Sequence, residues 1–142
     1  MTIKLSAGVV LLLIALALQF FFASAGVFVN LAFAALISFA FIFGFWELVA
    51  LTLLATFIIN WQPAASAEIL IFALFPIAVY FVRDVIPWQP WVVAPIAVVL
   101  GYAVFYGIAG PGFFLAHTDR FALDLVAGLS FGALAFFPLT RF

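Results

Sequence analysis

Long uncharged apolar runs constrain this sequence more than any other feature. The first of them, residues 5–22, contains 18 residues without a charge, and a helix of about 20 residues crosses the hydrocarbon core of a bilayer. Of the 142 residues, 71% are hydrophobic and 6% are charged, whereas soluble domains average about 25% charged residues. A small soluble globule cannot hide so much apolar surface. The sequence therefore predicts a single all-α domain, a polytopic transmembrane helical bundle.

Six short apolar segments are predicted to span the membrane. They cover residues 5–22, 27–43, 46–59, 68–82, 91–109 and 121–137. The stretch 27–59 is divided because, as one helix, it would be about 50 Å long, and the hydrocarbon core is only about 30 Å thick. Gly44, Trp46 and Glu47 supply the break, with a flexible glycine, an interfacial tryptophan and the only charge of the stretch. An undivided helix, giving five spans, is the alternative.

The first apolar segment also has features of a secretory signal peptide. Lys4 precedes it, and the small residues Ala23, Ser24 and Ala25 follow it as they would before a cleavage site. The run 5–22 is longer than the ~7–15 residues of a typical signal-peptide core. A first transmembrane span is therefore the favoured interpretation.

The basic residues indicate an orientation. Basic residues prefer the cytoplasmic side of a membrane protein. With six spans and a cytoplasmic N-terminus, Lys4, Arg83 and Arg141 lie in the cytoplasm and only Arg120 lies outside. With five spans, the four basic residues divide equally between the two sides. The distribution therefore favours six spans with both termini in the cytoplasm.

Composition argues against several classes of function. The formal net charge of −1 leaves no basic surface for nucleic acid. The chain has no cysteine, which removes disulfides, thiolate metal sites and cysteine nucleophiles. Its one histidine, His117, falls in a predicted loop, so neither a serine-hydrolase triad nor a bis-histidine haem site is expected. We therefore predict no catalytic residue, no cofactor and no metal site.

The richest group of polar side chains is His117, Asp119, Arg120 and Asp124. Arg120 and Asp124 are four residues apart, so they share a helix face and can form an ion pair. Asp124 lies about one turn inside the last span, where a paired charge costs less than a lone one. Two interpretations are open: a pair that fixes the helix end, or an interaction or ligand contact on the external face. Without a second histidine the group is a weak metal signal.

Gly128 and Gly132 form a Gly-x-x-x-Gly motif in the last span. Small residues one turn apart let two helix backbones approach closely. We expect both glycines to face another helix of the same chain, with dimerisation as the alternative. The 21 phenylalanines suit lipid-facing positions, and they also suit an apolar flank for a protein partner.

Three further features are shared with a known family. Residues 11–19 are an apolar run that ends in glutamine, Asn30 and Leu31 open the second span, and the last span carries Asp124 and is followed by Arg141. In this order the features resemble the rod-shape-determining MreD family of small membrane proteins. The resemblance implies six spans with both ends in the cytoplasm, in the bacterial cytoplasmic (inner) membrane.

The function that this resemblance implies is a non-enzymatic scaffold. Such a protein lies in membrane lipid and binds another integral membrane protein, one with a single span, of the machinery that elongates the cell wall. The layout is also similar to the substrate-binding subunits of energy-coupling-factor vitamin transporters. A transporter subunit that binds a small vitamin-like molecule is therefore the alternative, and an accessory subunit of a larger membrane complex is a third.

Overall fold

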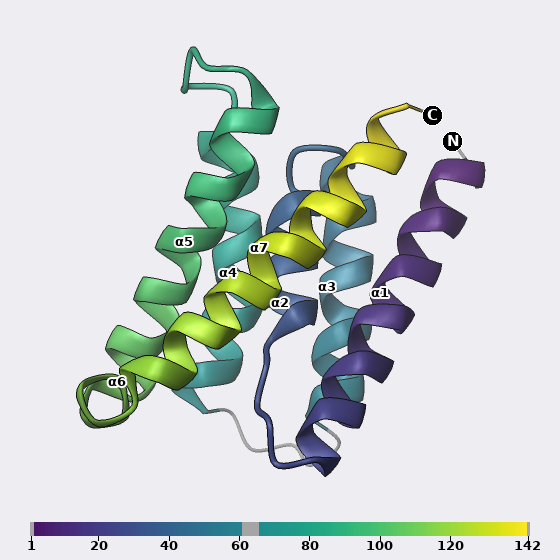
Figure 1. Ribbon diagram of the computed structural model, residues 1–142. Helices are drawn as coiled ribbons and strands as arrows, with labels where there is room; N and C mark the ends of the chain where they lie inside the picture. The colour runs from purple at the N-terminus through teal and green to yellow at the C-terminus, as the bar shows by residue number, and fades with distance from the viewer. Residues whose placement is uncertain (1, 61–65, 142) are drawn as a thin grey trace.

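The computed structural model describes residues 2–60 and 66–141, and within these ranges every regular element is a helix (Figure 1). This confirms the predicted all-α fold. The helices are α1 (Thr2–Ser24), α2 (Leu31–Phe39), α3 (Phe45–Ile59), α4 (Ala67–Val82), α5 (Pro90–Ala109), α6 (Pro111–Ala116) and α7 (Thr118–Thr140). By length and composition, α1, α5 and α7 can each cross a membrane, while α3 and α4 are shorter apolar helices.

Local sequence explains where several helices begin and end. After α1, Gly26 adopts a left-handed conformation (φ 79°) that suits glycine. The amides of Gly26 and Val27 then bond back to the carbonyls of Ala23 and Phe22, at 3.0 and 2.9 Å. This is the usual pattern of a glycine-terminated helix. At the start of α4, the Ser66 hydroxyl accepts the Ile69 amide at 3.4 Å as an N-cap.

The predicted break between the second and third spans is present. The Glu47 carboxylate accepts the Gly44 amide at 3.0 Å, so this acid caps the first turn of α3. Two other segments differ from the expectation. The helix in the second predicted span covers only Leu31–Phe39, instead of residues 27–43, and the predicted loop after α5 contains the short helix α6. Apolar composition alone marks neither the unwinding before α2 nor the turn at α6.

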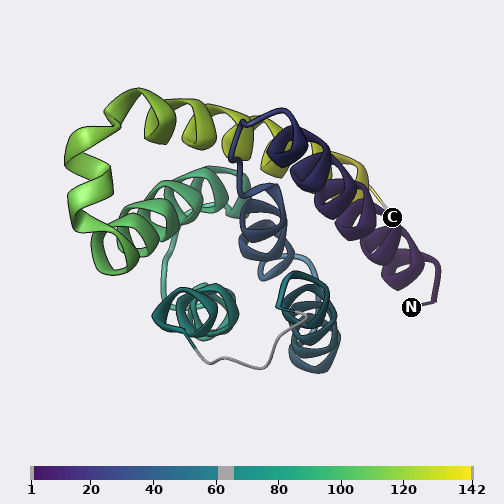
Figure 2. The same ribbon diagram turned by 90° about the horizontal axis from the view of Figure 1, so that it is seen from below.

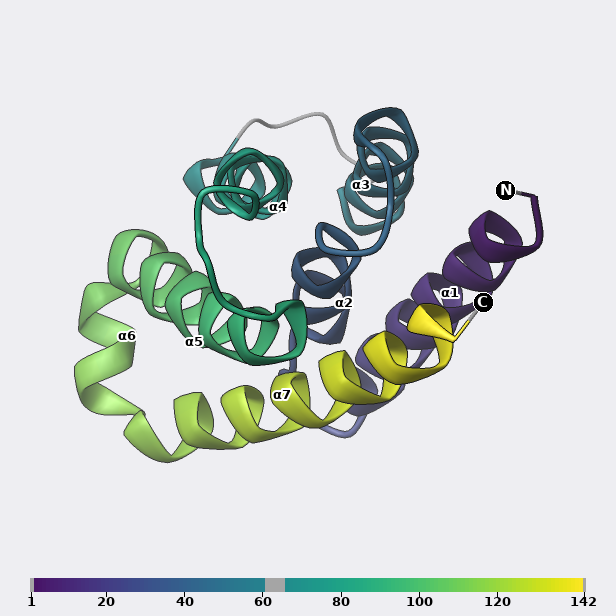
Figure 3. The same ribbon diagram turned by 90° about the horizontal axis from the view of Figure 1, so that it is seen from above.

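The chain runs back and forth between the two ends of the bundle (Figure 1). The start of α1 and the end of α7 lie at the same end, as an even number of passes requires. Seen along the bundle, α2 is surrounded by α1, α3, α4, α5 and α7 (Figures 2 and 3). The structure therefore has one short helix at its centre and longer helices around it.

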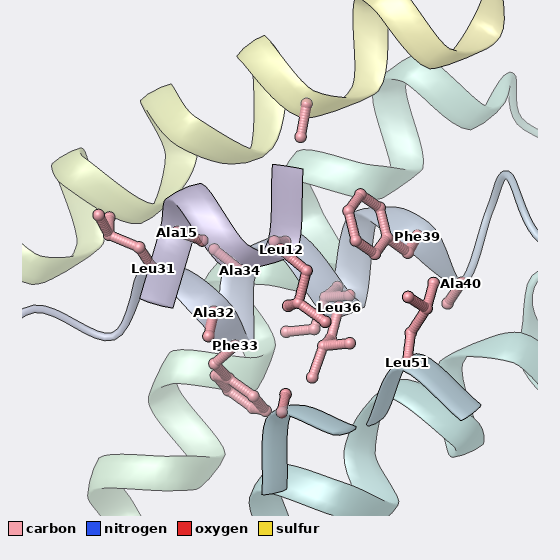
Figure 4. Close-up of a cluster of buried hydrophobic side chains, with 14 of the residues drawn as sticks. Leu12, Ala15, Leu31, Ala32, Phe33, Ala34, Leu36, Phe39, Ala40 and Leu51 are labelled. Atoms are coloured by element: carbon pink, nitrogen blue, oxygen red, sulfur yellow. The ribbon is translucent and has the colours of Figure 1, made fainter. Parts of the chain in front are cut away.

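All nine residues of α2 are buried. Figure 4 shows its side chains Phe33, Leu36 and Phe39 among apolar side chains that include Leu12 of α1 and Leu51 of α3. A nine-residue helix is only about 14 Å long at 1.5 Å per residue, less than half the thickness of a hydrocarbon core. A membrane crossing at α2 would therefore need non-helical backbone at both of its ends. Such backbone is tolerated at membrane depth only where protein surrounds it and binds its polar groups.

Candidate functional site

The polar groups of the core gather at the N-terminal end of α2. Asp124 of α7 is fully buried, and one of its carboxylate oxygens accepts the backbone N–H of Asn30 at 2.6 Å. The hydroxyl of Tyr106 donates a hydrogen bond to the other oxygen. Asn30 is the last residue before α2, so the carboxylate lies at the positive end of the helix dipole, where an acid is favourable.

Two more side chains bind backbone groups at the same end. The Tyr102 hydroxyl donates to the carbonyl of Asn30 at 2.6 Å, and the Gln19 carbonyl oxygen accepts the amide of Ala32 at 3.2 Å. These groups come from α5 and α1. Three surrounding helices thus supply hydrogen bonds that water would supply in a soluble protein.

The C-terminal end of α2 is bound by a base. The Arg83 guanidinium donates to the carbonyls of Ala40 and Phe43, the second at 3.2 Å. It lies 4.1 Å from the centre of the Tyr80 ring and 3.5 Å from a carboxylate oxygen of Asp84. A cation suits the negative end of a helix dipole. Opposite charges therefore hold the two ends of this central helix.

The structure separates the predicted cluster of polar residues. Asp119 and Arg120 are exposed on the first turn of α7, and His117 lies half-buried just before it. Asp124 points into the bundle, and it does not form the expected ion pair with Arg120. Among the residues that the structure describes, the ion pair is the one between Arg83 and Asp84. Spacing places Arg120 and Asp124 on one face of the helix, but the Asn30 amide and the Tyr106 hydroxyl lie close enough to bind the carboxylate instead.

Gly128 and Gly132 both lie against other helices of the same chain. A Cβ atom added to Gly128 would be 2.4 Å from the Tyr102 hydroxyl oxygen, and one added to Gly132 would be 2.9 Å from the Ser38 hydroxyl oxygen. Glycine at these positions lets α7 approach α5 and α2. Asp124 belongs to α7 together with Gly128 and Gly132. The same close approach of α7 therefore also brings Asp124 to Asn30.

A cavity of about 260 Å³ lies beside the N-terminal end of α2. Its wall contains both polar and apolar side chains, which come from α1, α3, α4, α5 and the residues before α2 and α4. The lining residues are Gln19, Asn30, Thr56, Ile59, Ser66, Glu68, Ile69, Phe72 and Phe105. In described residues 2–60 and 66–141, no three His, Asp or Glu side chains lie close enough to hold a metal ion. The polar groups in its wall are the amides of Gln19 and Asn30, the hydroxyls of Thr56 and Ser66, and the Glu68 carboxylate.

A second hollow lies between α5 and α7 on the outside of the bundle. Small residues, Ala94, Gly132 and Ala133, form its base, and the large side chains Trp91 and Phe137 flank it. Its volume is only about 80 Å³. Its wall is largely apolar and reaches inward to the buried Ser38 of α2.

Several of these residues were not singled out from sequence. Tyr102 and Tyr106 are four residues apart in an apolar helix, which places both hydroxyls on one face. That spacing, together with the acid Asp124 in another span, could have predicted a buried polar cluster. The role of Arg83 at the end of α2 could not be predicted from neighbouring residues, because the carbonyls that it binds are 43 and 40 residues away in sequence.

The polar groups at both ends of α2 bind backbone atoms of the same chain. These hydrogen bonds stabilise the fold and do not by themselves indicate a function. Comparisons with known proteins add no assignment. No protein-family model, curated protein or solved structure matches this chain. The resemblance to the MreD family therefore remains an expectation, and function has to be inferred from the cavity, the outer hollow and the distribution of charge.

Proposed function

We propose that this chain is a non-enzymatic scaffold of the bacterial cytoplasmic membrane that binds another integral membrane protein. The observation that carries the proposal is the hollow between α5 and α7. It is lined by the small residues Ala94, Gly132 and Ala133, of which Ala133 is half-buried and can meet a side chain of a foreign helix. Helices associate in lipid through such close packing of small residues, since lipid tails are as apolar as leucine.

The side chains around the hollow support a helical partner. Trp91 is 58% exposed and Phe137 is 56% exposed, so both are available to pack on either flank of a docked helix. Ser38 and Gly132 also line the hollow, but both are buried and pack on each other within the chain. The half-buried Ala133 is therefore the small residue that a docked helix would meet. The hollow holds about 80 Å³, so it admits one side chain of a partner helix that packs across α5 and α7.

The orientation is part of the same proposal. The start of α1, the end of α4 and the end of α7 share one end of the bundle (Figure 1), and they carry Lys4, Arg83 and Arg141. Arg120 is at the start of α7, at the other end. The positive-inside preference then assigns the end with three basic residues to the cytoplasm. The proposed role in cell shape rests on the resemblance of the sequence to the MreD family.

Filling the hollow should abolish partner binding without unfolding the protein. Ala133 lines the hollow and is only half-buried, so we expect Ala133→Trp to keep the melting temperature of the unaltered chain in detergent. A photo-crosslinking amino acid at position 133 should give an adduct with a single-span membrane protein. The matched control is Leu134, which is 69% exposed on the same helix and does not line the hollow.

The cellular readout uses the same pair of variants. In a rod-shaped bacterial host of this protein, depletion should give rounded cells, which Leu134→Trp restores to rods and Ala133→Trp does not. Rods after depletion, or equal rescue by the two variants together with no adduct at position 133, would contradict the proposal.

A further inference from the structure

We propose that the cavity beside the N-terminal end of α2 binds a small organic cation, a primary ammonium group attached to an aromatic or apolar body. This site is separate from the hollow between α5 and α7, and the proposal does not depend on the scaffold function. It rests on the size and lining of the cavity, on its charge and on its aromatic wall.

Polar side chains converge on this cavity from separate parts of the chain. Gln19 comes from the end of α1, Asn30 from the unwound segment before α2, Thr56 from α3, and Glu68 from the first turn of α4. Glu68 is exposed, and Gln19 and Thr56 also bond within the fold. A few convergent polar groups in a partly apolar space are typical of a small-ligand site. At about 260 Å³ it is slightly smaller than the ~300 Å³ lower limit of common ligand pockets, which calls for a small ligand.

The charge of the cavity selects a cation. Glu68 supplies a carboxylate, and among the described residues none of those that line the cavity is basic. The remaining polar side chains in the wall are neutral amides and hydroxyls. An ammonium group beside Glu68 gains charge-assisted hydrogen bonds, whereas an anion is repelled.

The apolar wall selects the body of the ligand. Phe72 and Phe105 line the cavity, and both rings pack on the buried ring of Phe33, with centroid distances of 5.6 and 5.5 Å. Glu68 and Phe72 are four residues apart on α4, so the carboxylate and the ring share one face. Aromatic faces attract cations and stack with other rings.

Asn30 supplies a group that the fold leaves unused. Its side-chain oxygen is buried and has no hydrogen-bond partner within the described part of the chain, although its backbone N–H and carbonyl are both bound. Buried polar atoms normally have partners. A rotation of the Asn30 amide toward the cavity gives this oxygen the N–H donor of a bound ammonium group.

Three probes of one body and different charge test the proposal. They are 2-phenylethylammonium, 2-phenylethanol and 3-phenylpropionate, titrated calorimetrically into the purified full chain in nanodiscs of a zwitterionic lipid. We expect saturable one-to-one binding of the ammonium probe, about tenfold tighter than the alcohol, and no saturable binding of the carboxylate. Glu68→Gln and Asn30→Ala should each weaken binding of the ammonium probe about threefold or more.

The controls separate binding in the cavity from partition into lipid. Asp119→Asn removes an exposed acid that does not line the cavity, and it should leave the affinity unchanged. Empty nanodiscs should give only linear uptake of each probe. Glu68→Gln should melt at the temperature of the unaltered chain, so that a loss of binding reports on the site. Equal affinity for all three probes, an unchanged affinity in Glu68→Gln, or no saturable binding at all would overturn the proposal.

Discussion

Asp124→Leu is expected to lower the free energy of unfolding by about 2–6 kcal/mol. The substitution leaves the Asn30 N–H and the Tyr106 hydroxyl without their acceptor, and each unsatisfied buried group costs about 1–3 kcal/mol. It also removes the acid from the N-terminal end of α2. The loss should appear as a melting temperature lower by about 10 °C or more in detergent, measured by the loss of the monodisperse peak after heating.

Two further variants show whether the effect comes from these hydrogen bonds. Asp124→Asn keeps an oxygen that can accept the Asn30 N–H, so it should lose less stability than Asp124→Leu. Asp119→Asn changes an exposed acid of the same helix, and it should melt within about 2 °C of the unaltered chain, because surface substitutions usually cost less than 0.5 kcal/mol. If Asp124→Leu melts with the control, the carboxylate does not hold the end of α2.

Gly128→Leu is expected to destabilise the protein by about 3 kcal/mol through overpacking. Its new Cβ atom would start 2.4 Å from the Tyr102 hydroxyl oxygen. Tyr102 is fully buried, and its hydroxyl binds the Asn30 carbonyl. The ring cannot move aside without breaking that bond. The helices α5 and α7 must separate instead, which also draws Asp124 away from Asn30.

A second glycine in a helix provides the control for Gly128. An added Cβ at Gly107 of α5 meets nothing within 4 Å. Gly107→Leu should therefore keep or slightly raise the melting temperature, since glycine is a poor helix former by about 1 kcal/mol. Unchanged stability in Gly128→Leu, measured beside this control, would show that α7 does not pack here as closely as described.

Sequence predicted the long helices well because their signal is local. A run such as residues 5–22, in apolar solvent, has to form a helix to satisfy its own backbone, and α1 covers Thr2–Ser24. The capped break at Gly44 could also be predicted from sequence, since Glu47 lies three residues after the glycine whose amide it binds. In both cases the physical cause lies within a few residues of its effect.

The shortness of α2 could not be predicted in the same way. Residues 27–30 are as apolar as many helical segments, and nothing within them requires an extended backbone. Their conformation depends on acceptors and donors that lie far away in sequence, such as Asp124, 94 residues from Asn30. The pairing of Asp124 with Arg120 failed as a prediction for the same reason. Helical spacing indicated a partner within reach, while the competing partners lay on other elements.

The cavity beside the N-terminal end of α2 could not be predicted from the sequence either. Gln19 and Asn30 stand in separate spans, and Glu68 has the ordinary position of an acid at a helix start. Only the unwinding before α2 brings them to one space. Its recognition needed the three-dimensional arrangement of several helix ends, which no local pattern encodes.

We propose that the chain crosses the membrane six times, with the short α2 and its flanking backbone forming one crossing. Because the chain has no native cysteine, a single introduced cysteine reports without background on which side of the membrane its position lies. Single cysteines would replace Ile3, Ala67, Thr118 and Thr140, which all have exposed or terminal positions. A membrane-impermeant thiol reagent is then applied to intact cells, and again after permeabilisation.

Six crossings with cytoplasmic termini predict labelling of intact cells at positions 67 and 118, and labelling at positions 3 and 140 only after permeabilisation. If the segment around α2 does not cross, every later position changes side. Position 140 would then be labelled in intact cells, while positions 67 and 118 would be protected, and that result would contradict the account.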